Sequence, residues 1–123
     1  MSAQPNLDSK YDILAKTPEQ RSDYLLKRMV VTEEIWTLVD NDGAMILTTD
    51  EEDCIPVWPD ADFARDWING DWSHCKPHKI SLHDWQHKWL PGLEDDEIQI
   101  VAFPVPGEDG LVLAPWEMAE ELA

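Results

Sequence analysis

Four histidines and one cysteine lie within fourteen consecutive positions, and they are the residues of this sequence best suited to chemistry. His83 and His87 are four residues apart, a spacing that places both imidazoles on one face of a helix, within reach of one metal ion. Cys75 or His78 could supply a further ligand from the preceding segment. The sequence therefore offers a candidate site for zinc or another divalent metal at Cys75, His78, His83 and His87.

The same cluster gives little support for catalysis. Residues 83 to 87 resemble the HExxH helix of zinc proteases, but Asp84 replaces the glutamate and is shorter by one methylene group. Cys75 has His74 and His78 nearby in sequence, which does not provide the spatial arrangement that activates a thiolate. The sequence favours a non-enzymatic protein, and a small metal-dependent or hydrolytic enzyme built on this cluster is the alternative.

The charge of the chain limits the partners it can bind. Its 123 residues include 26 acidic and nine basic ones, which gives a net charge of −17. Nucleic-acid phosphates require clustered Lys and Arg, and an anionic membrane surface would repel this chain. We expect neither nucleic acid nor membrane as a partner. The acidic field would instead attract a protein partner of basic character.

Tryptophans are the second unusual feature, with seven in the chain. Trp58, Trp72 and Trp116 lie at the ends of predicted elements, beside proline or polar residues, where an indole is often half exposed. Half-exposed indoles are favoured anchors at protein interfaces. These three residues are therefore the candidate interaction surface.

Residues 1 to 16 contain neither a signal peptide pattern nor regular periodicity, and the chain has no apolar run of about 18 residues. We interpret this segment as a loose N-terminal arm and residues 17 to 123 as a single domain. A cytoplasmic protein with reduced thiols is expected. The domain begins at Thr17, where Pro18 and Gln20 complete the pattern of a capping box and predict a helix to about residue 31.

The rest of the domain alternates between strand and helix patterns. Residues 35 to 39 and 44 to 48 predict a β-hairpin, and Pro56 marks the third strand, residues 54 to 58, as an edge or strand end. Later elements are a helix at 61 to 69, an irregular connection at 71 to 80, a helix at 81 to 90 ended by Pro91, strands at 98 to 103 and 111 to 113, and a helix at 115 to 122. This order predicts an α+β fold: a small mixed, mostly antiparallel sheet of about five strands, with three to four helices packed mainly on one face.

Several motifs in this order resemble a bacterial domain of unknown function, the family numbered 2750. They are E-E-I-W-T-L from residue 33, P-V-W-P from 56, K-W-L-P-G-L from 88, F-P-V-P from 103 and P-W-E-M-A from 115. The resemblance covers about residues 20 to 123 and implies a small stand-alone bacterial protein without an established activity or cofactor. Residues 42 to 67 show a looser resemblance to SseB-type domains linked to type III secretion.

The leading hypothesis is a small acidic bacterial protein that acts as a non-enzymatic protein-interaction module, such as an adaptor or an immunity-like protein. It rests on the charge, the tryptophans and the missing catalytic signatures. One alternative is a metal-binding protein or a small hydrolytic enzyme using the histidine cluster. A further alternative is a small-ligand binder with an apolar pocket between the sheet and the tryptophan-bearing helices.

Overall fold

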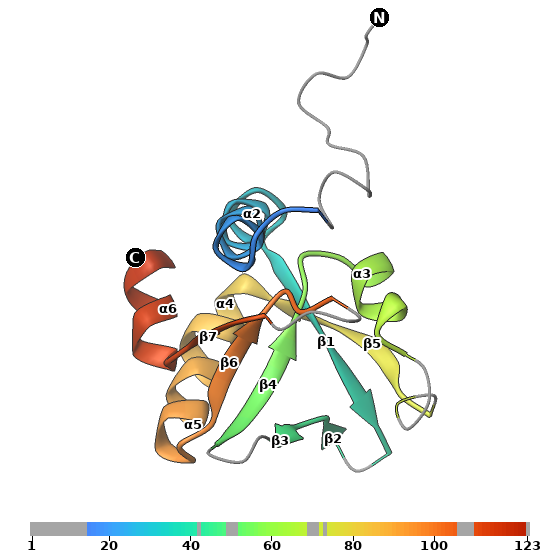
Figure 1. Cartoon of the computed structure of the whole chain (residues 1–123). Coiled ribbons are helices and arrows are strands. Elements are labelled where there is room, and N and C mark those ends of the chain that lie inside the picture. Colours follow the sequence, from blue (N-terminus) through green and yellow to red (C-terminus); the bar gives the residue numbers. More distant parts are fainter. Residues whose placement is uncertain are drawn as a thin grey trace, which may run out of the picture.

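The strands of the chain form two small sheets (Figure 1). The computed structural model describes residues 15–41, 43–48, 52–68, 72, 74–105 and 110–122. The first sheet contains β2 (Gly43–Ala44), β1 (Glu34–Asp40) and β5 (Lys76–Ser81), and the second contains β3 (Leu47–Thr48), β4 (Asp53–Val57), β6 (Gln99–Ala102) and β7 (Leu111–Leu113), each in that order. Only the β4–β6 pair is parallel among these described strands. The predicted α+β class is confirmed, but the strands are divided between two sheets instead of forming one.

Helices cover the second sheet and the junction of the two sheets. They are α2 (Pro18–Thr32), α3 (Ala61–Asp66), α4 (Leu82–Asp84), the π-helical segment η2 (Trp85–Trp89), α5 (Leu90–Asp95) and α6 (Pro115–Leu122). In Figure 1, α5 and α6 lie beside β6 and β7, and α2 lies across the top of the sheets. Leu25 and Met29 of α2 and Met118 of α6 are fully buried in the core. No helix within the described ranges is long and apolar enough to cross a membrane.

The predicted hairpin is confirmed in its first half only. β1 and β2 pair antiparallel, with Val39 opposite Ala44. The second predicted strand is wrong as a single strand, because the chain leaves the first sheet after Ala44 and β3 pairs with β4, with Leu47 opposite Cys54. Connecting the two sheets in this way buries apolar side chains from both of them in one core.

Pro56 lies on an interior strand of the second sheet, so of its two predicted places the edge strand is wrong. The other, a strand end, is nearly met, since Pro56 is the last residue but one of β4. β4 is flanked by β3 and β6, but β3 pairs only with the first two residues of β4. Beyond the end of β3, the hydroxyl of Thr37 donates a hydrogen bond of 2.7 Å to the carbonyl oxygen of Pro56. A proline is tolerated here because the neighbouring strand has ended where its missing N–H would matter.

The expected irregular connection over residues 71 to 80 is wrong for its second half, which is β5. This strand pairs antiparallel with β1 over six residues, from Lys76 opposite Val39 to Ser81 opposite Glu34. Its sequence, K-P-H-K-I-S, shows no alternation of apolar and polar residues. β5 stands at the edge of the described sheet, where lysine and proline are common and where only Ile80 needs to be buried.

The helix expected to end at Leu90 continues through Pro91 to Asp95. Its middle is π-helical, and the N–H of Leu90 donates to the carbonyl of Trp85, five residues earlier. In a regular α-helix the ring of Pro91 would clash with the carbonyl of His87. The wider π turn just before the proline accommodates this ring, so the helix is not broken.

Asp60 caps α3, and its ionisation should make the stability of the protein depend on pH. Its carboxylate accepts a hydrogen bond of 3.3 Å from the N–H of Phe63, and burial raises the pKa of Asp60. Because the folded-state pKa is raised above the unfolded value of about 3.9, ionisation of Asp60 removes stability as the pH rises through the folded-state pKa. Asparagine keeps the cap without ionising. Thermal unfolding from acid to neutral pH should therefore show Asp60→Asn gaining stability relative to the wild type as the pH rises.

The matched variant Asp60→Ala should be about 1 kcal/mol less stable than Asp60→Asn at all pH values, because neither side chain ionises and only alanine removes the cap. Equal pH profiles for the wild type and Asp60→Asn would contradict the argument for a desolvated carboxylate.

Candidate interaction site

The three tryptophans expected at an interaction surface differ in exposure. Trp58 is fully buried, so its expected surface position is wrong. The backbone groups of Trp58 and Trp36 exchange two hydrogen bonds of 2.8 and 2.9 Å, which join β4 to β1, and the indole Nε1 of Trp58 donates to the carbonyl of Pro104 at 2.8 Å. Trp72 is half-buried, and its ring centroid lies 6.3 Å from that of Trp67. These two tryptophans are part of the core or packed against it.

Trp116, in contrast, is 55% exposed and stands on the first turn of α6. The turn is fixed by its own cap, since the carboxylate of Glu117 accepts a hydrogen bond of 2.9 Å from the N–H of Ala114. Pro115 is buried directly before Trp116. The indole is therefore held out from the surface by a rigid helix start, which is what an interface anchor requires. Its role as an anchor stays a prediction.

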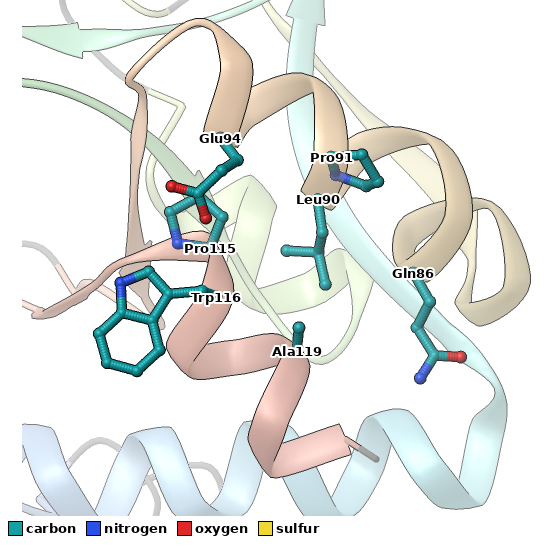
Figure 2. A pocket seen from close by; sticks show the side chains of 7 residues that line it. All are labelled: Gln86, Leu90, Pro91, Glu94, Pro115, Trp116 and Ala119. Atoms are coloured by element: carbon teal, nitrogen blue, oxygen red, sulfur yellow. The ribbon is translucent and has the colours of Figure 1, made fainter.

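An open groove of about 240 Å³ runs between α6 and the helix formed by η2 and α5 (Figure 2). Its lining is largely apolar, and Glu94 is its only acidic member among the described residues. The lining residues are Gln86, Leu90, Pro91, Glu94, Pro115, Trp116 and Ala119. Figure 2 shows the indole of Trp116 at one end of this Trp116 groove, directed away from Leu90 and Pro91 of α5.

The two helices that form the walls of the Trp116 groove are held together by buried side chains. Trp85 of η2 is fully buried, and its indole Nε1 lies 3.2 Å from the sulfur of Met118 in α6. Trp85 also stacks against Trp89, with ring centroids 6.1 Å apart. The groove is thus a preformed feature of helix packing, because its two walls share buried contacts in the core.

A second groove, of about 260 Å³, lies on another side of the same helix. It is lined by Lys88, Trp89, Gly92, Leu93 and Asp96. Both grooves are smaller than the roughly 300–1,000 Å³ of typical small-molecule sites, and both lie at the helices rather than between the sheets and the helices. They give no specific support to the alternative of a small-ligand binder.

The structure brings together two of the four expected metal ligands. The ring centroids of His83 and His87 are 4.5 Å apart, and both side chains are exposed. His78 lies on β5 opposite Thr37, and the sulfur of Cys75 contacts His74. Within the part of the chain that the structure describes, no three or more His, Cys, Asp or Glu side chains are grouped to hold a metal ion. Neither Cys75 nor His78 therefore joins the two helix histidines as the expected further ligand.

Cys75, His74 and Asp40 do form a small cluster, but its geometry does not activate the thiol. His74 uses one nitrogen, Nε2, for both neighbours: it lies 3.9 Å from the sulfur of Cys75 and 3.5 Å from the carboxylate of Asp40. To activate the thiol as in a catalytic triad, one ring nitrogen of His74 would have to contact Cys75 and the other would have to contact Asp40. Burial, and next the charge of Asp40, raise the pKa of Cys75. Burial also raises the pKa of the other free thiol, Cys54. The hydrolytic alternative gains no support from either cysteine.

Sequence reasoning missed the wall of the groove opposite Trp116. Gln86, Leu90 and Glu94 are spaced by four residues, so a continuous helix places them on one side. The signal was present, but the expected helix end at Pro91 separated Glu94 from the other two residues. A helix predicted to continue past the proline would have shown this face.

The fold and the groove together define a small α+β protein with an exposed indole between two helices. The chain belongs to the family described as protein of unknown function (DUF2750), whose family model matches residues 22–122. This match confirms the resemblance that the sequence motifs indicate, and the looser resemblance to SseB-type domains stays a prediction. No curated protein and no solved structure matches the chain.

Proposed function

We propose that this protein is a non-enzymatic protein-interaction module whose Trp116 groove binds a short segment of a partner protein. The segment places an apolar side chain against Trp116 and carries basic residues on both sides of it. The observation that carries the proposal is the exposed indole of Trp116 beside an apolar groove with preformed walls. Hot spots of protein interfaces have this form, a rigid aromatic side chain at a pocket.

The exposed part of Trp116 is large enough to matter for binding. A tryptophan buries up to about 250 Å² in a core or an interface. Covering the 55% that is now exposed would stabilise a complex by about 2–3 kcal/mol at about 25 cal/mol per Å². This single contact would be a major part of the affinity of a short peptide.

The charge around the groove favours a basic partner. Glu94 lines the groove, and the exposed Asp95 and Asp96 follow it at the end of the same helix. On α6, Glu120 and Glu121 are exposed next to Ala119. Neither α5 nor α6 contains a lysine or arginine. Complementary charges would accelerate association and make the affinity decrease as salt screens them.

Peptides of defined sequence provide the test. We expect a peptide with one leucine or phenylalanine between pairs of lysines or arginines to shift the indole N–H resonance of Trp116, assigned with Trp116→Phe. Trp116→Ala should weaken binding of this peptide about tenfold or more, as expected for a central hot spot. The variant should lose no more than about 3 kcal/mol of stability, because somewhat less than half of the side chain is already buried.

Val31→Ala is the matched control, because Val31 is 72% exposed on α2 and does not line the groove. This variant should bind the peptide as the wild type does. A peptide with glutamates in place of the basic residues should bind far more weakly. Binding that is insensitive to Trp116→Ala, or equal for the basic and acidic peptides, would contradict the proposed function.

A further inference from the structure

We propose that His83 and His87 form a separate surface site that binds one divalent transition-metal ion, with Cu²⁺ and Ni²⁺ preferred over Zn²⁺. Among the residues that the structure describes, these two imidazoles are the metal ligands of the site, and water completes the coordination. The site does not depend on the peptide groove, since neither histidine lines it.

The distance between the two rings fits coordination of one ion. A metal bound at about 2.0–2.1 Å from an imidazole nitrogen lies about 3.2 Å from the centre of that ring. Two such rings at a right angle around the metal would have centroids about 4.5 Å apart, and a tetrahedral angle would separate them by about 5.2 Å. The centroids of His83 and His87 are 4.5 Å apart in the structure. Right angles belong to square-planar and octahedral ions such as Cu²⁺ and Ni²⁺, whereas zinc sites are mostly tetrahedral.

The backbone that carries the two histidines is held on both sides. Trp85, which lies between them in sequence, is fully buried and contacts the sulfur of Met118. At the start of the helix, the hydroxyl of Ser81 accepts a hydrogen bond of 3.1 Å from the N–H of Asp84, and the N–H of Leu82 donates to the carbonyl of Glu33 at 2.8 Å. A pair of ligands on a fixed turn loses little conformational entropy when a metal joins them.

The charge of the surroundings favours a cation. The nearest lysine on the same helix, Lys88, lies 3.6 Å from the carboxylate of Asp84, which partly offsets its charge. The net charge of −17 raises the local concentration of divalent ions around the whole molecule. Both imidazoles are exposed, so an ion can reach them and keep its remaining water ligands.

Calorimetric titration of the untagged protein with Ni²⁺ tests the site, and titrations with Cu²⁺ and Zn²⁺ test its preference. We expect one ion per chain, an order of affinity in which Cu²⁺ exceeds Ni²⁺ and Ni²⁺ exceeds Zn²⁺, and about tenfold or greater weakening in His83→Ala and in His87→Ala. The metal should also raise the melting temperature of the wild type, because the bridge stabilises the folded helix, and this increase should be absent in both variants.

His78→Ala is the matched control, because His78 is also exposed but lies on β5. It should bind the metal as the wild type does. His83→Gln and His87→Gln replace the alanine variants if either of those fails to fold. Binding that survives loss of either histidine, binding that is lost equally in His78→Ala, or the absence of binding by the wild type would overturn the proposal. Trp116→Ala should leave metal binding unchanged, so the two proposals fail independently.

Discussion

Replacing Trp58 by alanine should lower the free energy of unfolding by about 3–5 kcal/mol, which is typical for removing a large aromatic ring from a core. The side chain is fully buried and lies where the two sheets are joined by the backbone pair between Trp36 and Trp58. Its loss would leave a cavity against Trp67, whose ring centroid is 6.1 Å away. Urea unfolding followed by far-UV circular dichroism measures the effect.

Trp58→Phe distinguishes the contribution of the apolar ring to stability from that of the indole N–H. Phenylalanine keeps most of the apolar volume but leaves the carbonyl of Pro104 without the indole donor that now lies at 2.8 Å. We expect a loss of about 1–3 kcal/mol, clearly less than for alanine. If the alanine variant is as stable as the wild type, the indole does not hold the sheets together as we describe.

Arg21 should be the second residue with a large effect, with a loss of about 3 kcal/mol in Arg21→Met. Its guanidinium is fully buried, and Nε and one terminal nitrogen donate to the carbonyls of Phe103 and Lys16 at 3.1 and 2.5 Å. Phe103 has a left-handed backbone with φ of 52°, which is strained for a residue with a side chain. The hydrogen bond from Arg21 helps to hold this conformation. Urea unfolding again provides the measurement.

Arg28 offers a control on the same helix. Its Nε is buried and has no hydrogen-bond partner among the described residues. Replacing it by methionine removes an unsatisfied donor as well as the apolar stem, so Arg28→Met should change stability by no more than about 1 kcal/mol. Similar losses for both arginines would show that the hydrogen bonds of Arg21 are not the source of its effect.

Helix starts were the part of the fold that the sequence predicted best. The capping box at Thr17 and the caps at Asp60 and Ser81 are all present. Caps are local interactions between residues three positions apart, so the sequence shows both partners at once. The Asp60 and Ser81 helices end differently from their prediction: α3 is shorter, and the helix after Ser81 passes through Pro91.

Strands were harder to predict, because pairing depends on residues far away in the chain. The sequence of β5 lacks any strand pattern, and the segment forms a strand because six consecutive residues of β1 pair with it. The strand expected over residues 44 to 48 divides because its two ends pair with different sheets. Neither arrangement can be read from a local pattern, since each is decided by tertiary contacts.

In the candidate site, too, local contacts could be predicted from the sequence and long-range contacts could not. Trp58, Trp72 and Trp116 were predicted to be partly exposed because each lies at the end of a predicted helix or strand. Of these three, Trp116 alone is mainly exposed. Trp58 is buried by a bridge to a residue 22 positions earlier, which no local rule indicates. The spacing of His83 and His87 did predict their proximity, because a helix sets that distance by itself.

The parallel pairing of β4 with β6 affects how the protein is made on the ribosome. Ile55 pairs with Ile100, and the buried Arg21 needs the carbonyl of Phe103, so the early part of the chain depends on residues from its last quarter. During synthesis from the N-terminus, most of the core partners are absent until those residues emerge. Until then the nascent chain must stay in solution with its apolar strands uncovered. The many carboxylates of the chain would keep such molecules apart by mutual repulsion during that time.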